Sequence, residues 1–171
     1  SLISQRVVIQ YVYAMTLDTS FPLEDIVFSS LECLGLARKP KVISVPEITS
    51  AKMAFRKMLR HNITSIPVLD THGKIVSVLS MTDIRVLSCK ETDDQYRTDN
   101  MLEGLVVPFI ERARKYSSET LQEPCIRAHQ VITCKPDIML SDSIALMVNN
   151  HVHHIYVVEK QVPIGVVSFA D

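Results

Sequence analysis

Glycine is scarce in this chain. Only four of its 171 residues are glycines, and these are Gly35, Gly73, Gly104 and Gly165. A P-loop and a dinucleotide-binding fingerprint each need several glycines at short, fixed spacings, so neither motif can be written here. No Ser or Cys stands in a nucleophile-elbow context, and no pair of carboxylates stands out as an acid/base dyad. We therefore expect no catalytic activity.

Long apolar runs and a strong net charge are also missing. No stretch approaches the ~18 apolar residues that a membrane-spanning helix needs. Eighteen Lys and Arg residues balance 19 Asp and Glu residues, which leaves a formal net charge of −1. That balance lacks the basic footprint of a protein that binds long nucleic acid. We expect neither a membrane nor a nucleic acid among the partners.

The four cysteines form no recognisable cluster. Cys33, Cys89, Cys125 and Cys134 contain no C-x-x-C spacing and are too sparse for a disulfide framework. Such thiols are typical of an intracellular protein in which they stay reduced. We expect a cytoplasmic location, with the nucleus as a further compartment.

The most informative stretch is Ile66–Asp83. Two apolar runs flank the turn-forming residues Asp70–Gly73, which predicts a β-hairpin with a four-residue connection. Ser80-Met81-Thr82-Asp83 follows the second run, where a helix can begin. These residues can be helix N-caps that accept the free N–H groups of the first turn. Alternatively, the amides and a hydroxyl can bind a phosphate, and the carboxylate can bind a ribose diol.

This stretch occurs twice. Three strings recur, namely Val42–Val45 as Val131–Cys134, Ile66–Asp70 as Ile155–Glu159, and Ser77–Asp83 as Gly165–Asp171. Between the first and second strings, each copy holds apolar residues spaced as one helix face, which are Ala51, Phe55, Met58 and Leu59 in the first copy and Leu140, Ile144, Met147 and Val148 in the second. The chain is therefore predicted to be a tandem β-α-β-β-α repeat of the α/β class.

Two copies of this unit resemble a pair of CBS domains, a Bateman module. The resemblance implies two small three-stranded sheets, each with two helices on one side, packed about a pseudo-twofold axis. Ser29–Leu36, Val152–Val158 and Val166–Asp171 narrow it further. They resemble the last two CBS repeats of the gamma subunit of AMP-activated protein kinase.

The resemblance also suggests domain boundaries. Residues 1–17 are expected to be the end of a preceding CBS repeat, residues 18–37 a connector, residues 38–90 a CBS repeat, residues 91–119 a linker with a helix, and residues 120–171 a CBS repeat truncated at its end. We expect the chain to be a fragment of a protein with four such repeats. The linker helix, Met101–Tyr116, carries the apolar stripe Leu102, Leu105, Val106 and Phe109, for which packing is favoured over a partner surface. Pro108 would kink or break this helix unless the helix begins just before it.

Two nucleotide sites follow from the resemblance. One combines Asp83 on a ribose and Thr82 near a phosphate with His153 and His154 of the other repeat. The second combines Asp171 and Ser168 with Thr49, Thr64 and Ser65. Apolar walls for the base are expected from Val42, Ile66, Val131 and Ile155.

The histidines leave three interpretations open. His154 stands where the family has Arg, so a permanently charged fork is replaced by an imidazole that titrates near pH ~6.5. A metal site is disfavoured because alternation along a strand would place His151 and His153 on one face and His154 on the other. A strand edge with no ligand is the remaining alternative to phosphate binding.

The implied function is that of a non-catalytic, adenine-nucleotide-binding regulatory subunit. Its ligands would be AMP, ADP and ATP. Its partners would be the catalytic alpha subunit and the bridging beta subunit of an AMP-activated (Snf1-type) Ser/Thr kinase. A second hypothesis is a CBS scaffold or phosphatase-regulating interaction protein with weak or absent nucleotide binding. A third is a regulatory insert within an enzyme or a transporter.

Overall fold

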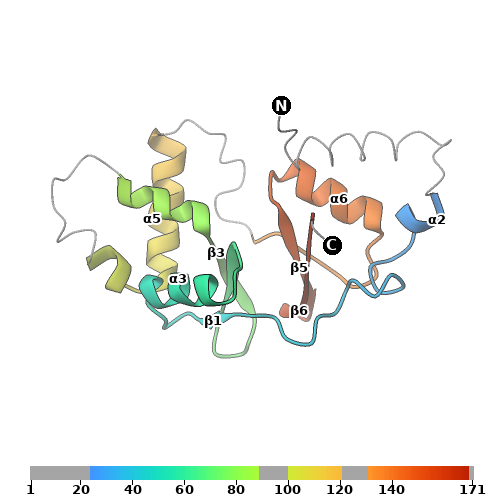
Figure 1. The fold of residues 1–171 in the computed structure, drawn as a ribbon, viewed down its shortest axis with the longest axis horizontal. Helices are drawn as coiled ribbons and strands as arrows, with labels where there is room; N and C mark the ends of the chain where they lie inside the picture. The colour runs from blue at the N-terminus through green and yellow to red at the C-terminus, as the bar shows by residue number, and fades with distance from the viewer. Residues whose placement is uncertain (1–23, 89–99, 121–130, 170–171) are drawn as a thin grey trace. The chain divides into compact units, whose positions relative to one another are not determined.

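A computed structural model describes residues 24–88, 100–120 and 131–169 (Figure 1). The chain forms two compact units. Unit 1 comprises residues 1–42 and 132–171, and unit 2 comprises residues 43–131. Within the described ranges, no helix is long and apolar enough to cross a membrane.

Unit 2 contains the first repeat. Its elements are β1 (Val45–Pro46), α3 (Ala51–Arg60), β2 (Ser65–Leu69), β3 (Ile75–Ser80), the 3₁₀ helix η1 (Met81–Ser88) and α5 (Val106–Thr120). The sheet order is β1-β2-β3, in which β1 runs parallel and β3 antiparallel to β2. This confirms the predicted order of strand, helix and hairpin. The helix α3 begins at Ala51 because the Ser50 side chain accepts the N–H of Met53.

The predicted hairpin turn is present between β2 and β3, but its connection runs from Asp70 to Lys74, one residue longer than predicted. Asp70 Oδ1 accepts the N–H groups of His72 and Lys74, each at 2.8 Å. The Gly73 N–H donates to the Asp70 carbonyl at 3.1 Å, and Gly73 has a φ of +78°, which glycine adopts without strain. Asp70 and Gly73 therefore form the turn that the sequence predicted, Asp70 by accepting backbone N–H groups and Gly73 by its positive φ.

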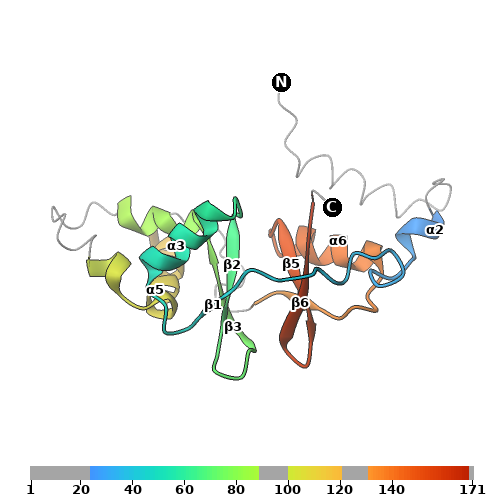
Figure 2. The same ribbon diagram turned by 60° about the horizontal axis from the view of Figure 1, so that its bottom comes forward.

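The core of unit 2 lies between the sheet and two helices on one side of it (Figures 1 and 2). The fully buried side chains include Met58, Ile66, Val68, Leu79, Val106 and Ile110. Phe55 of α3 and Phe109 of α5 meet edge to face, with ring centroids 5.5 Å apart. Leu59, predicted on the buried face of α3, is instead 67% exposed, because it lies one position past Met58 and turns toward solvent.

The linker helix α5 packs on this core. It begins at Val106, so Pro108 occupies its first turn, where a missing N–H disrupts no helical hydrogen bond. Val106 and Phe109 are buried and Leu102 is half-buried, which confirms a packing role for these three residues. Leu105 is 52% exposed, because it precedes the helix. Its predicted place in the packed stripe is wrong.

Unit 1 contains the second repeat. Its elements are α2 (Glu24–Val27), β4 (Thr133–Cys134), α6 (Leu140–Asn149), β5 (His154–Glu159) and β6 (Val162–Ser168). The sheet order is β4-β5-β6, again with one parallel and one antiparallel pairing. In its core, Met147 of α6 packs with Ile155 and Val157 of β5 and Val167 of β6.

A segment from before the first repeat completes unit 1. We call residues 29–39 the leader segment. Leu31 and Ala37 of this segment are 0% and 1% exposed and belong to the core of unit 1. The Leu31 N–H donates to the Ile138 carbonyl, and the Leu140 N–H donates to the Ser29 carbonyl, both at 2.9 Å. The second repeat therefore folds around residues that lie before the first repeat in the sequence.

Unit 2 is completed in the same manner. The Ala51 N–H donates to the Gly104 carbonyl, and the Val106 N–H donates to the Thr49 carbonyl, both at 2.9 Å. Residues 104–106 precede the second repeat in the sequence but pack on the first. The segment before the first repeat thus packs on the second repeat, and the segment before the second repeat packs on the first. The sequence analysis did not predict this arrangement.

Candidate functional site

The residues after β3 form a reciprocal helix cap. Asp83 Oδ2 accepts the N–H of Ser80 at 2.8 Å, and Ser80 Oγ accepts the N–H of Thr82 at 3.3 Å. The hydroxyls of Ser80 and Thr82 are also hydrogen-bonded to each other, at 2.9 Å. This resembles a capping box, in which two terminal N–H groups are satisfied by two side chains, except that Ser80 Oγ accepts the N–H of the second helical residue and not that of the third. The capping interpretation of Ser80-Met81-Thr82-Asp83 is confirmed.

The cap leaves Asp83 with capacity for a ligand. An ionised carboxylate has about four acceptor positions, of which the Ser80 N–H takes one. Burial raises the pKa of Asp83, while the Ser80 N–H and the Arg114 charge act in the opposite direction. Thr82 beside it is exposed. The junction of β3 and η1, which we call the Ser80–Asp83 loop, therefore offers a fixed carboxylate and an accessible hydroxyl.

Arg114 is a basic neighbour that the sequence analysis missed. It projects from α5, and its guanidinium donates to the Val78 carbonyl of β3 at 3.3 Å. Its charge lowers the pKa of Asp83. A signal existed in the helical spacing, because Arg114 follows Ala113, a buried residue of the face that packs on the core. It could be used only once α5 was known to pack on the first repeat.

Two further predicted residues lie next to this loop. Ser65 pairs in register with Ser80, and the Met81 N–H donates to the Thr64 carbonyl at 2.9 Å. Thr64 is exposed, whereas Ser65 is buried. Thus Thr64 and Ser65, which we had assigned to the second site, gather with the Ser80–Asp83 loop in unit 2.

The remaining residues of the second predicted site belong to different units. Thr49 is half-buried in unit 2, where its carbonyl accepts the Val106 N–H. Ser168 is half-buried at the end of β6 in unit 1. Asp171 lies outside the described residues. The proposed union of these groups in one cleft, and that of Asp83 and Thr82 with His153 and His154, stays a prediction.

Two of the four residues predicted as apolar walls need correction, whereas Val42 and Val131 are half-buried and stay a prediction. Ile66 and Ile155 are both 0% exposed and form part of the separate cores of unit 2 and unit 1. Their side chains face the helices that cover each sheet. They are therefore packing residues and cannot form an open wall for a purine.

The histidines of the second repeat lie in three different environments. His154 opens β5 opposite Ser168, and its ring meets Tyr156 edge to face with centroids 5.6 Å apart. His153 is exposed and its ring meets Phe169 in the same manner, at 5.9 Å. His151 lies before β5, in a left-handed conformation with a φ of 55°. The expected alternation of all three along one strand is therefore wrong.

The charge state of His154 differs from the expected one. Burial, helped by the charge of His153, lowers the pKa of His154 to about 4. Its imidazole is therefore neutral near pH 7, and the expectation of titration near pH ~6.5 is wrong for the free protein. Among the residues that the structure describes, no group of three or more His, Cys, Asp or Glu side chains is placed to hold a metal ion.

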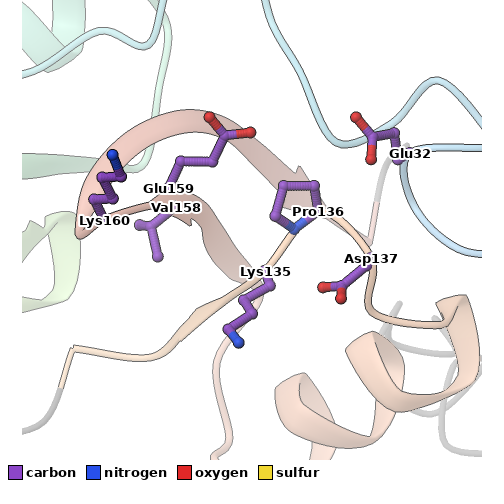
Figure 3. Close-up of a pocket in the computed structure, with 7 residues that line it drawn as sticks. All are labelled: Glu32, Lys135, Pro136, Asp137, Val158, Glu159 and Lys160. Carbon is purple, nitrogen blue, oxygen red and sulfur yellow. The ribbon is translucent and has the colours of Figure 1, made fainter.

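Unit 1 also has a pocket of about 460 Å³ (Figure 3). The leader segment, the loop before α6 and the turn between β5 and β6 form its lining, with residues Glu32, Lys135, Pro136, Asp137, Val158, Glu159 and Lys160. None of them is a predicted site residue. Arg38 forms ion pairs with Glu32, at 3.6 Å, and with Glu159, which connects two of these lining segments.

Known proteins share this fold. An uncharacterized protein of Methanocaldococcus jannaschii is 25% identical over 142 residues, which span 77% of this chain and 83% of that protein. A CBS-domain protein of Agrobacterium tumefaciens has a solved structure similar to 84% of this chain and 90% of its own, with a TM-score of 0.60 and 15% identity. A Pyrobaculum aerophilum CBS-domain protein, solved in complex with AMP, matches 82% of this chain and 88% of its own, with a TM-score of 0.58 and 16% identity.

One more solved structure extends well beyond this chain. It is a Methanocaldococcus jannaschii protein proposed as an archaeal homologue of g-AMPK, with a TM-score of 0.59 and 21% identity. The match covers 98% of this chain but only 51% of that protein. The CBS domain family model itself matches residues 36–88 and 126–171, which together make up more than half of this chain. The chain belongs to the CBS-domain family and carries two CBS domains in tandem.

Proposed function

We propose that this chain binds an adenine nucleotide and serves as a nucleotide-sensing regulatory module of an AMP-activated (Snf1-type) Ser/Thr kinase. The observation that carries the proposal is the Ser80–Asp83 loop. Its carboxylate is fixed by the Ser80 N–H and keeps acceptor positions for a ribose diol, and the exposed Thr82 hydroxyl lies beside it. A group that is already fixed loses little conformational freedom when a ligand binds.

The relatives support the class of ligand. A solved structure of a CBS-domain protein named CBSX2 and that of the Pyrobaculum aerophilum protein both hold AMP, each at 16% identity to this chain. At that identity the similarity concerns the fold alone. Binding of an adenine nucleotide by this chain therefore has to be argued from its own residues. The kinase partners, an alpha catalytic and a beta bridging subunit, rest on the resemblance of Ser29–Leu36 and Val152–Val158 to gamma subunits.

The mechanism we propose is linkage between two ligands. A nucleotide that binds one arrangement of the module more tightly shifts the chain toward that arrangement, and a kinase subunit that prefers it then binds more tightly. AMP, ADP and ATP would compete for the same site with different effects on the partner. This chain would supply binding energy and no chemical step.

Calorimetric titration with AMP, 2′-deoxy-AMP and 3′-deoxy-AMP tests the ribose contact. Asp83→Asn retains the volume of the side chain and an acceptor for the Ser80 N–H, but loses the charge. We expect the parent to bind AMP about 10-fold to 100-fold more tightly than at least one of the two deoxy ligands. This is the change in affinity for the loss of a hydrogen bond to a charged group. Asp83→Asn should lose this preference, while Asp70→Asn, in the exposed turn of the same unit, should keep it.

Equal affinity of parent and Asp83→Asn for all three ligands would remove Asp83 from the site. Purification of the full-length protein from cells tests the partner separately. Recovery of a Ser/Thr kinase subunit supports the kinase assignment. Repeated recovery of a phosphatase, with no kinase, contradicts it whatever the nucleotide result.

A scaffold function is the second candidate, and His154 favours it. Where the gamma family has an always-charged Arg, this chain has an imidazole whose pKa is lowered to about 4. A neutral ring offers a phosphate one N–H and no charge. Binding of AMP no tighter than binding of adenosine would show that the phosphate is not recognised and would favour this second function.

A further inference from the structure

The leader segment packs on residues of unit 1 that are distant from it in the sequence. The whole of unit 2 separates it in sequence from residues 132–171, which form the rest of unit 1. Its contacts are nevertheless those of a core element. Leu31 is fully buried, the Glu32 N–H donates to the Pro136 carbonyl at 3.0 Å, and the Lys39 N–H donates to the Ile164 carbonyl at 3.1 Å.

The surface that receives the leader segment is shaped for it. Gly165 of β6 lies directly against the leader backbone, because a Cβ built on Gly165 would overlap the Ala37 carbonyl oxygen and lie 2.9 Å from its carbon. Both contacts are to backbone, which cannot move aside as a flexible side chain could. Figure 2 shows the segment after α2 passing across β6.

Ion pairs of Arg38 add to the contacts between the leader segment and the rest of unit 1. Arg38 follows Ala37 and pairs with Glu159 at the end of β5 and with Glu32 within the leader segment itself. Figure 3 shows Glu159 and Glu32 on the two sides of the Pro136 ring. The leader segment thus contacts this surface through a buried Leu, a small residue against Gly165, and an ion-paired Arg immediately after it.

We propose that this surface of unit 1 also receives the leader segment of a second copy of the chain, so that two chains exchange leader segments. The same contacts form whichever chain supplies the segment. Only residues 40–42, which include Pro40, connect it to Ile43 on the core of unit 2. A short connector between an element and the rest of its chain is the setting in which domains exchange.

The tether decides which form dominates. In one chain, the short connector gives the leader segment a high effective concentration at its own surface. Exchange therefore becomes visible when binding within the same chain is disabled. Leu31→Asp disables the leader segment by placing a carboxylate at a fully buried position. Gly165→Ala disables the surface, because its added methyl group overlaps the Ala37 carbonyl.

These two variants test the proposal together. After joint unfolding and refolding, the intact leader segment of Gly165→Ala can bind the intact surface of Leu31→Asp. We expect a one-to-one heterodimer by size-exclusion chromatography with light scattering, and no dimer when either variant is refolded alone. Gly104→Ala is the matched control. Its Cβ would meet no atom closer than 3.4 Å, so its own leader segment stays bound and it should form no heterodimer with Leu31→Asp.

A second measurement uses the unaltered chain, in case a variant does not fold. Chains with ordinary and heavy nitrogen are unfolded together, refolded over a range of concentrations and analysed by native mass spectrometry. Dimers of mixed mass whose share rises with concentration, and falls when the connector at residues 40–42 is lengthened with Gly and Ser, support exchange. Monomers at every concentration, or a dimer that is indifferent to connector length, overturn it. Neither result depends on nucleotide binding.

Discussion

The two units cover equivalent sheets in different ways. In unit 2 the long helix α5 packs on the sheet through Val106, Ile110 and Ala113. In unit 1 the corresponding place is taken by the leader segment, which is largely non-helical and reaches the core with Leu31 and Ala37. Among the residues that the structure describes, the place that a helix takes in unit 2 is therefore taken in unit 1 by a segment of turns and irregular backbone.

The two hairpins have different residues at one equivalent position of their second strands. Val68 pairs with Ser77 in unit 2, and Val157 pairs with Gly165 in unit 1. In unit 2 this position is a buried serine. In unit 1 the Ala37 backbone approaches Gly165 so closely that only glycine fits. The residue at this position, Ser77 in β3 and Gly165 in β6, thus differs between the two units where the neighbouring backbone comes closest to Gly165.

The largest expected effect comes from the cover itself. Leu31→Ala should lower the free energy of unfolding of unit 1 by about 2–5 kcal/mol, because it leaves a cavity at a fully buried position. Val106→Ala, at the equivalent place in unit 2, should lower that of unit 2 by less, because fewer atoms are removed. Amide hydrogen exchange resolves the two units. Equal loss of protection in both units after Leu31→Ala would contradict the assignment of the leader segment to unit 1 alone.

A pH-dependent effect distinguishes the starts of the two hairpins. Ser65 faces Ser80 in unit 2, while His154 faces Ser168 in unit 1. The folded pKa of His154 is about 4, below its ordinary value of 6.5, so the unfolded chain binds a proton first as the pH falls. Stability is therefore fully present above pH 6.5 and is lost as the pH falls toward 4, by an amount on the order of 2–3 kcal/mol.

Urea denaturation at pH 7.5 and pH 4.5 measures this loss. His154→Ser, which copies the residue of unit 2, should show a smaller loss between the two values than the parent does. His72→Ser, at an exposed position in the other hairpin, serves as a control and should leave the difference unchanged. Identical pH profiles for the parent and His154→Ser would mean that His154 is not held neutral by burial.

Asp83 should act with the opposite sign. Burial raises its folded pKa above the ordinary value of 3.8, so its charged form is the one that folding disfavours. Its contribution is most favourable at low pH and is lost as the pH rises through the folded pKa. Asp83→Asn should therefore become more stable relative to the parent as the pH rises from about 3.8, measured by denaturation across that range. A difference that is constant with pH would contradict the raised pKa.

Local patterns in the sequence predicted the hairpins, the helix α3 and the cap at Asp83, because each depends on residues close together in the chain. The packing of the leader segment on the second repeat was not predictable in this way. Leu31 and Ile138 are far apart in sequence, and nothing near either one indicates the other. Gly165 carried a weak signal, since a glycine within a strand marks a close backbone approach. The charge state of His154 required knowledge of its burial.

The smallest expected effect concerns the two turns. In unit 2 the turn uses Asp70 and Gly73, which suit its geometry. In unit 1 the two-residue turn is Lys160-Gln161, and both residues have positive φ, 50° and 69°. Turns of this kind prefer Asn-Gly, because side chains other than Asn and Asp are strained there.

Replacing Lys160-Gln161 by Asn-Gly should therefore stabilise unit 1 by about 1 kcal/mol, less whatever the flexible glycine adds to the entropy of the unfolded chain. Lys160→Ala is the matched control for loss of the ammonium group, since Ala keeps the unfavourable left-handed conformation and should give no gain. Because the turn belongs to unit 1 alone, hydrogen exchange of β5 and β6 should slow while that of β2 and β3 stays the same. A gain in Lys160→Ala equal to that of Asn-Gly would show that the lysine charge, and not backbone strain, distinguishes this turn from the one in unit 2.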